Sequence, residues 1–246
     1  LICPDSHTCT LGGLGALAWG VGSTEAEHAL ATSTLRVTRP QTMRVSFAGV
    51  LNEGVSAKDL ILFTIRELSA SGGAGYAIEF AGPAIAVLPV EARLTLCNMT
   101  TELSAFTGLI APDQKVLDYC AGRRYAPQAE VWHQATQHWQ SLRSDEGAAF
   151  DQEHHFDIGS LKPQLSWGTS PHHCVDWDEV IPHASDAPDA SASTAWQRAQ
   201  DYMGVTPGSQ LSDYALDAAF IGSCTNSRLS DLQLAAAYLN HTGYKV

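Results

Sequence analysis

Three short stretches of this 246-residue chain carry side chains that could do chemistry. In the first, Asp5, Ser6 and His7 place a carboxylate, a hydroxyl and an imidazole side by side in a polar turn. Neighbouring side chains diverge, so these three residues cannot form a hydrolase triad among themselves. Two interpretations stay open: a turn that binds an oxygen-rich substrate, with His7 held by a carboxylate elsewhere, or an ordinary turn that caps the next helix.

The second stretch contains Glu79, inside the otherwise apolar segment 76–81. A carboxylate in such a segment must face solvent or pair with another group. The pattern alone favours an exposed strand face. The alternative is a buried carboxylate that orients an imidazole.

The third contains Cys224, which stands between an apolar run at 215–222, predicted as a buried strand, and a helical pattern from about Leu229 to Leu239. Backbone N–H groups and the helix dipole would stabilise a thiolate at such a junction. This setting suits a metal ligand, a cluster ligand or a nucleophile. One thiol cannot hold a zinc ion or an iron–sulfur cluster, because these need three or four protein ligands.

Two further features indicate structural roles. The glycine-rich run 12–22 lacks the dinucleotide fingerprint and the P-loop pattern, which favours close packing of a helix on a sheet. The pairs His154-His155 and His172-His173 fall in irregular polar segments and are interpreted as surface histidines.

The elements that must position these groups alternate between strands and helices. Strands are predicted at 43–51, with Met43, Val45 and Phe47 on one face, and at 76–81. Helices are predicted at 24–35, 56–68, 89–106, 113–121, 128–142 and 194–203. The alternation predicts an α/β fold with a largely parallel sheet. The proline-bearing stretch 151–193 is predicted to be an irregular connection.

Composition excludes several functional classes. The chain is 45% hydrophobic and 16% charged, so it can bury a core. Fourteen basic against 26 acidic residues give a net charge of −12, which argues against a nucleic-acid or anionic-membrane partner. The apolar stretches fall far short of the roughly 20 residues of a spanning helix. Six cysteines are too sparse for a disulfide scaffold and fit a reducing, cytoplasmic location.

Both ends of the sequence carry apolar residues. Residues 1–3 are predicted to end one strand, and residues 244–246 to begin another. Because natural termini usually lie outside packed elements, the sequence is interpreted as an internal fragment of a longer chain. A complete protein trimmed by processing is the alternative.

Taken together, these segments resemble the aconitase superfamily, and within it the branch that acts on isopropylmalate. The matching segments, in family order, are 5–10 (DSHTCT), 15–22, 25–32, 72–75, 79–82, 96–99 (LCNM), 145–148, 164–171, 202–204 and 220–228 (FIGSCTNSR). The resemblance implies three-layer α/β/α domains with mainly parallel sheets, incomplete at both ends. The implied parts are the end of a first domain at 1–38, a second domain at 39–152, an irregular linker at 153–193 and the start of a third domain at 194–246.

The same resemblance implies a hydro-lyase of leucine biosynthesis. Such an enzyme interconverts 2-isopropylmalate and 3-isopropylmalate by dehydration and rehydration through isopropylmaleate, using a [4Fe–4S] cluster. A separate small subunit carries the serine base. The remaining cluster cysteines and the arginines that bind substrate carboxylates are expected outside these residues, so the chain alone is expected to be inactive.

Roles transfer from the family motif by motif. Cys224 corresponds to the first of three cluster cysteines, and Asn226 beside it to a substrate-binding residue. Asp5, Ser6 and His7 correspond to the turn that binds substrate. Glu79 corresponds to the carboxylate that pairs with His7, and these two residues form the implied catalytic pair.

Other functions stay open at this point. They are a related hydratase (homoaconitase, citraconate hydratase or aconitase), a non-catalytic remnant without a cluster that serves as a binding module, and a cysteine hydrolase that uses Cys224 and His7. No nucleic-acid or membrane partner is expected.

Overall fold

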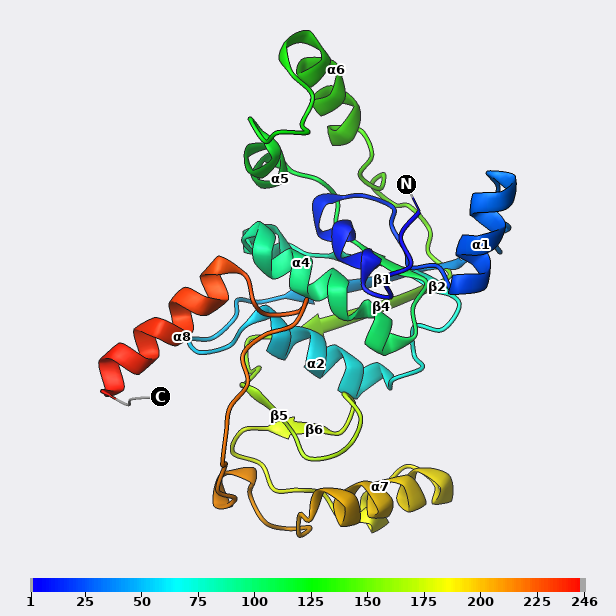
Figure 1. Ribbon diagram of the computed structural model, residues 1–246. Helices are drawn as coiled ribbons and strands as arrows, with labels where there is room; N and C mark the ends of the chain where they lie inside the picture. The colour runs from blue at the N-terminus through cyan, green and yellow to red at the C-terminus, as the bar shows by residue number, and fades with distance from the viewer. Residues whose placement is uncertain (1, 244–246) are drawn as a thin grey trace.

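A parallel sheet forms the centre of the fold in the computed structural model, which describes residues 2–243 (Figure 1). The strand predicted at 244–246 lies outside the described residues, as does Leu1, and Ile2 and Cys3 form no strand. The sheet has four strands in the order β3-β2-β1-β4, and every neighbouring pair is parallel. They are β1 (Gln41–Ala48), β2 (Tyr76–Ala81), β3 (Thr107–Leu109) and β4 (Gln152–Asp157). The predicted α/β class is confirmed.

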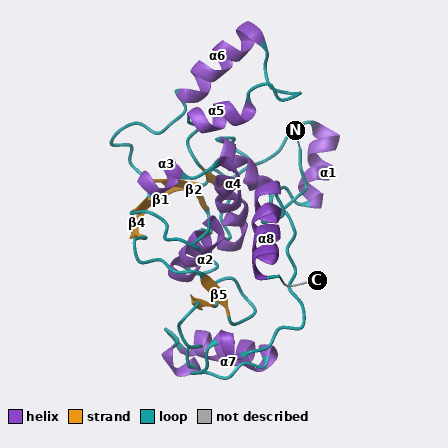
Figure 2. Cartoon of the chain, turned by 90° about the vertical axis from the view of Figure 1, so that its left-hand side faces the viewer, coloured by secondary structure: helices purple, strands orange, loops and turns teal. Residues whose placement is uncertain are grey.

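One face of the sheet is covered by helices and holds the main core. Met43, Val45 and Phe47 of β1 are each 0% exposed and point to this face, as their alternation predicts. The covering helices are α2 (Ala57–Leu68), α3 (Pro83–Val87) and α4 (Val90–Asn98). Figure 2 shows α2 and α4 on the same side of the sheet. The Ser56 side chain accepts a hydrogen bond from the Asp59 backbone and so begins α2 where its capping box predicts.

The expectation of an irregular connection over 153–193 is wrong at its start. Residues of β4 pair with β1 from Met43↔Gln152 to Ala48↔Asp157, so this segment belongs to the central sheet. Further on, β5 (Gln164–Ser166) and β6 (Cys174–Asp176) form an antiparallel pair. The sequence pattern did not predict these strands, because their segment is rich in polar residues and prolines. An edge strand with one solvated face needs few apolar residues.

The buried strand expected at 215–222 does not form. The segment has no regular secondary structure and bends at Asp217, and Phe220 is 87% exposed. A strand needs a hydrogen-bonded neighbour, and none of the strands within residues 2–243 pairs with this segment.

The remaining helices surround this centre. They are α1 (Ser23–Thr32), α5 (Gln114–Cys120), α6 (Ala129–Gln140), α7 (Ala190–Met203), α8 (Leu229–Thr242) and the 3₁₀ helices η1 (Thr8–Leu14), η2 (Met99–Leu103), η3 (Ala184–Asp186) and η4 (Leu211–Asp213). The helix predicted from Thr194 begins at Ala190 because the Asp189 carboxylate accepts a 2.8 Å hydrogen bond from Ala192 N. Figure 1 shows α6 and α8 projecting from the body, and neither buries a residue. Among the described helices, none is long and apolar enough to cross a membrane.

Candidate functional site

The Asp5–His7 turn is positioned by two glycines of the segment that follows it, where the backbone comes close to neighbouring elements. The turn leads into η1, which packs against α4 and β3. A Cβ atom on Gly12 would lie 1.7 Å from the carbonyl oxygen of Gly108, and one on Gly13 would lie 2.7 Å from the amide nitrogen of Leu94. The glycine run therefore serves close packing, as the sequence indicates.

Hydrogen bonds within the turn fix the three polar side chains. The backbone N–H of His7 donates to Asp5 Oδ1 at 2.8 Å, and the Thr8 hydroxyl donates to the Asp5 carbonyl at 2.6 Å. Ser6 Oγ lies 3.0 Å from His7 Nδ1. These contacts make an Asx-type turn that also places its carboxylate next to its imidazole.

The imidazole of His7 lies between two carboxylates. Its Nδ1 is 3.9 Å from Asp5 Oδ1, and its Nε2 is 3.7 Å from Glu102 Oε1, while the side chain is 25% exposed. An imidazole so placed can hold a proton or pass one to a bound group. Glu102, on η2, was missed by sequence reasoning because nothing in its local pattern relates it to His7. Only the packing of η1 against the end of α4 brings them together.

Among the described residues the side chain of Glu79 contacts Ser144, and the carboxylates near His7 are those of Asp5 and Glu102. Glu79 lies on β2, on the face opposite the main core, and its Oε2 accepts a short hydrogen bond from the Ser144 hydroxyl. The half-buried strand-face position agrees with the interpretation that the pattern alone favours. Its neighbour Ile78 points the other way into the core, so the register of β2 fixes this orientation.

A loop at 223–228 carries Cys224 and is docked on the same helix end as the turn. The Cys224 thiol is exposed. The next residue, Thr225, donates its hydroxyl to Asn98 Oδ1 at 2.9 Å, and Asn98 Nδ2 donates to Thr10 Oγ1 at 2.8 Å. Asn98 closes α4 and is 0% exposed. One buried amide therefore connects the two predicted site segments, which lie at opposite ends of the sequence.

The side chain of Asn226 is turned toward the start of α8, and its amide oxygen is buried. Its Nδ2 donates to Asp231 Oδ1 at 3.1 Å, while its Oδ1 is buried with no hydrogen-bond partner among the described residues. A buried acceptor without a donor is costly. It is therefore suited to receive a hydrogen bond from a bound hydroxyl or water.

The described residues do not form a metal centre by themselves. Within residues 2–243 no group of three His, Cys, Asp or Glu side chains is placed to hold a metal ion. Cys9, Cys97 and Cys174 are buried, and the Cys9 thiol is engaged with the Asn98 carbonyl at 3.4 Å. Cys224 thus fits the part of one thiolate ligand, and these residues alone do not fit a cluster. Among the described imidazoles none hydrogen-bonds the Cys224 thiol, so the geometry of a cysteine hydrolase is not formed.

One of the four histidines interpreted as surface residues is buried. His155 is exposed as predicted, but His173 is 4% exposed and stacks on Trp167 with ring centroids 4.5 Å apart. Both ring nitrogens lack partners among the described residues. Burial, followed by the neighbouring His172, lowers the pKa of His173 to about 4.

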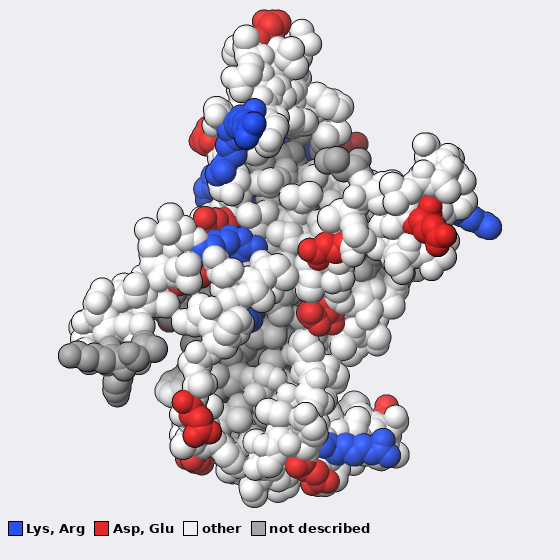
Figure 3. Space-filling view, viewed as in Figure 1, with Lys and Arg blue, Asp and Glu red and all other residues white. Residues whose placement is uncertain are grey.

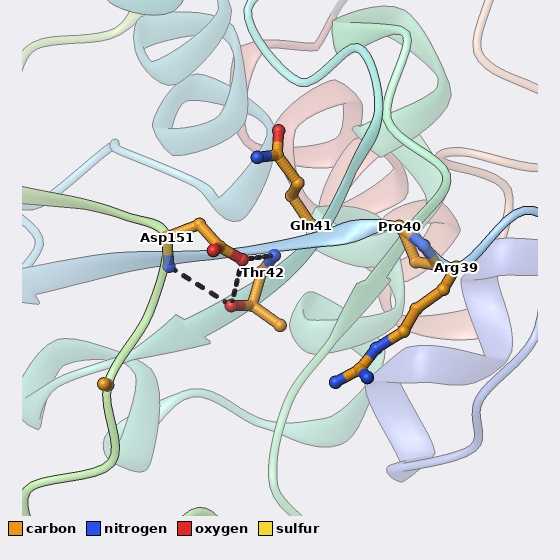
Figure 4. A pocket seen from close by; sticks show the side chains of 6 residues that line it. Arg39, Pro40, Gln41, Thr42 and Asp151 are labelled. Atoms are coloured by element: carbon orange, nitrogen blue, oxygen red, sulfur yellow. Dashed lines mark hydrogen bonds between the residues drawn. The ribbon is translucent and has the colours of Figure 1, made fainter.

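A cavity of about 450 Å³ opens at the start of β1, lined by Arg39, Thr42 and Asp151 among others. In Figure 4 the Asp151 carboxylate points to Thr42, whose amide and hydroxyl donate to it, and Arg39 lies on the other side of Thr42. None of the predicted site residues lines this cavity. Figure 3 shows the basic side chains on one face as small separate groups among acidic ones.

Comparison with known proteins identifies the family. The chain matches the aconitase family (aconitate hydratase) over residues 1–246. It is 53% identical over 236 residues to "3-isopropylmalate dehydratase large subunit 1" of Bradyrhizobium diazoefficiens. The match covers 96% of this chain and 50% of that relative, so the chain spans about half the relative's length. Its fold, its motifs and this match together show that the chain belongs to the aconitase family.

Proposed function

We propose that this chain supplies the substrate-binding turn and one cluster ligand of a 3-isopropylmalate dehydratase large subunit. The proposal rests on family membership and on one observation, the buried Asn98 amide that links the His7 turn to the Cys224 loop. The enzyme is a hydro-lyase that interconverts 2-isopropylmalate and 3-isopropylmalate through isopropylmaleate in the cytoplasm. A small subunit is its protein partner, in keeping with the words "large subunit" in the relative's name.

Each site residue has a distinct part in this proposal. Asp5 and Ser6 offer an acceptor and a hydroxyl to the polar groups of the hydroxy acid. His7 is the proposed acid–base group. Glu102, whose Oε1 lies 3.7 Å from His7 Nε2, takes the pairing role first expected of Glu79. Asn226 Oδ1 accepts a hydrogen bond from the substrate or from a water bound with it.

Cys224 is the proposed thiolate ligand of a [4Fe–4S] cluster, with the other ligands supplied by the remainder of a protein of the relatives' length. When bound, the cluster supplies an open iron position that acts as a Lewis acid. The described residues bind and orient the substrate around that position and move protons at the His7 ring.

A substrate panel tests the reaction class. A protein of the relative's length that contains this chain would be combined with a small subunit and assayed for hydration of isopropylmaleate, citraconate and cis-aconitate. Isopropylmaleate is expected to give the highest kcat/KM. Preference for cis-aconitate or citraconate would overturn the proposed substrate, and no hydration of any of the three would overturn the reaction class.

Replacing the two glutamates separately tests the assignment at His7. Glu102→Gln removes the carboxylate beside Nε2 and is expected to lower kcat by about 10²-fold or more, the usual scale of acid–base contributions. Glu79→Gln keeps a hydrogen-bonding group for Ser144 and is expected to leave kcat within about threefold. The opposite ranking would restore the original pairing of Glu79 with His7.

A further inference from the structure

The loop that carries Cys224 has little apolar packing to hold it. The segment before it, 215–222, is exposed, and α8 after it buries none of its residues. The contacts between the loop and the body are instead polar and converge on one face of α4. Hydrogen bonds at this face therefore determine where the Cys224 thiol lies.

Arg228 is at the centre of these contacts. Its Nη1 donates to the Thr225 carbonyl at 2.6 Å and to the Thr95 hydroxyl at 2.8 Å, and its Nη2 lies 3.3 Å from the Cys224 carbonyl. The Thr95 hydroxyl in turn donates to the Thr225 carbonyl at 3.1 Å. Thr95 is buried on α4, so a fixed point on the body is joined to two successive peptide groups of the loop.

We propose that Arg228 and Thr95 form a clasp that fixes the loop on α4, which makes Arg228 a positioning residue for the Cys224 thiol. Holding the carbonyls of Cys224 and Thr225 fixes the peptide planes on the two sides of the Thr225 Cα. The first of these planes is also the one that follows the Cys224 Cα, so it constrains the direction of the Cys224 side chain. A planar guanidinium can span two carbonyls and a hydroxyl at once, whereas a lysine ammonium acts as a single point. The importance of this position for catalysis rests on the proposed function; the clasp itself does not.

A simpler role for Arg228 would be to begin α8. Its backbone N–H donates to Asp231 Oδ2 at 3.0 Å, which caps that helix. Every substitution at this position except proline keeps the backbone N–H. Side-chain variants therefore remove the clasp and leave the cap in place.

Electron paramagnetic resonance of a nitroxide on Cys224 tests the clasp in the 246-residue chain. The background carries Cys3→Ser, because Cys3 is the other exposed thiol among the described cysteines. Arg228→Gln and Thr95→Val are each expected to convert a restricted spectrum into a mobile one, and Arg228→Lys is expected to recover the restriction only in part. The matched controls are Arg198→Gln on α7 and Thr136→Val on α6, which should leave the spectrum unchanged.

Hydrogen exchange without a label provides a second readout. Amides of residues 224–227 are expected to exchange about tenfold faster in Arg228→Gln and in Thr95→Val, the scale expected for loss of one or two hydrogen bonds. The double variant should add little to either single one, because both break the same unit. Unchanged spectra and exchange in folded Arg228→Gln, or full restriction in Arg228→Lys, would overturn the proposal.

The two proposals fail in different ways. If the intact longer protein hydrates none of the candidate substrates while Arg228→Gln still frees the loop, the proposed function fails and the clasp stands. If the longer protein is active and the loop is equally restricted in every variant, the clasp fails and the function stands.

Discussion

The hydroxyl of Thr225 donates a 2.9 Å hydrogen bond to the buried side chain of Asn98. The same amide donates to Thr10, three residues after His7. Cys224 and His7 are distant in the sequence, and this short chain of polar contacts places their segments at one end of α4. The arrangement explains how a segment with little apolar packing can be held at a defined place on the body.

Removing the Asn98 amide should destabilise the chain. Asn98→Ala leaves the hydroxyls of Thr10 and Thr225 without this partner, and the free energy of unfolding is expected to fall by about 1–3 kcal/mol. Urea denaturation followed by circular dichroism measures the change. Asn240→Ala, at an exposed position of α8, is the matched control and should stay within about 0.5 kcal/mol. Equal stabilities for the two variants would contradict the bridging role of Asn98.

A methyl group at Gly13 should separate η1 from α4. The added Cβ would lie 2.7–2.8 Å from backbone atoms of Arg93 and Leu94, which cannot move as a side chain does. Gly13→Ala is expected to lower stability by about 2 kcal/mol or more, the scale of overpacking in a core. At Gly22, with φ of −69°, the nearest atom to an added Cβ is 3.5 Å away. Gly22→Ala should therefore be tolerated, and calorimetry on both variants makes the comparison.

Buried His173 should make stability depend on pH. Burial and then His172 lower its pKa from 6.5 to about 4, so between these values the unfolded chain binds a proton that the folded chain does not. Stability from this group is fully present above pH 6.5 and is lost as pH falls toward 4, by about 3 kcal/mol in total.

His173→Phe isolates that contribution. Phenylalanine keeps the stack on Trp167 but cannot be protonated, so the variant should lose less stability than the native chain between pH 7 and 4.5. The carboxylates titrate in both proteins, so their contributions to the pH dependence of stability cancel when the two proteins are compared. Urea midpoints at several pH values give the two slopes, and parallel slopes would show that His173 is not buried as a neutral imidazole. His133→Phe, at an exposed position of α6, serves as the control.

Thiol reactivity should follow the burial pattern. Burial raises the pKa of the Cys97 thiol well above its usual value and that of Cys174 to about 11. Hydrogen bonds from Thr8 and the Asp5 backbone lower the pKa of exposed Cys3. Brief iodoacetamide treatment at pH 7.5 is expected to alkylate Cys3 and the exposed Cys224 and to leave Cys97 and Cys174 unlabelled. Peptide mass spectrometry measures the labelling of each cysteine. Comparable labelling of Cys97 in the folded chain would contradict its burial.

Elements with strong local signals could be predicted from the sequence. Alternating Met43, Val45 and Phe47 identified β1, and the capping box at Ser56 identified the start of α2, because both signals depend only on nearby residues. The errors at β4 and at 215–222 concern strand pairing. The polar segment β4 forms a strand because it pairs with β1. The apolar segment 215–222 forms no strand because none of the described strands lies beside it.

In the candidate site, too, residues in local motifs could be predicted from the sequence, and contacts made by tertiary packing could not. Asp5, Ser6, His7 and Cys224 are recognisable from their motifs, which are local. Glu102, by contrast, gains its relation to His7 only when two glycines let η1 approach α4. Arg228 lies within a recognised motif, yet its contacts with Thr95 depend on how the loop docks on α4. Tertiary packing decided these relationships, and no local pattern encodes them.

Cluster assembly tests the central claim most directly. A protein of the relative's length that contains this chain, and its Cys224→Ser variant, would be reconstituted anaerobically with iron and sulfide, combined with a small subunit, and assayed by visible absorbance and by isopropylmaleate hydration. The account predicts cluster absorbance and hydration in the first protein, and loss of hydration with a depleted or labile cluster in the variant. Full cluster content and full activity in Cys224→Ser would contradict the assignment of Cys224 as a ligand at the active site.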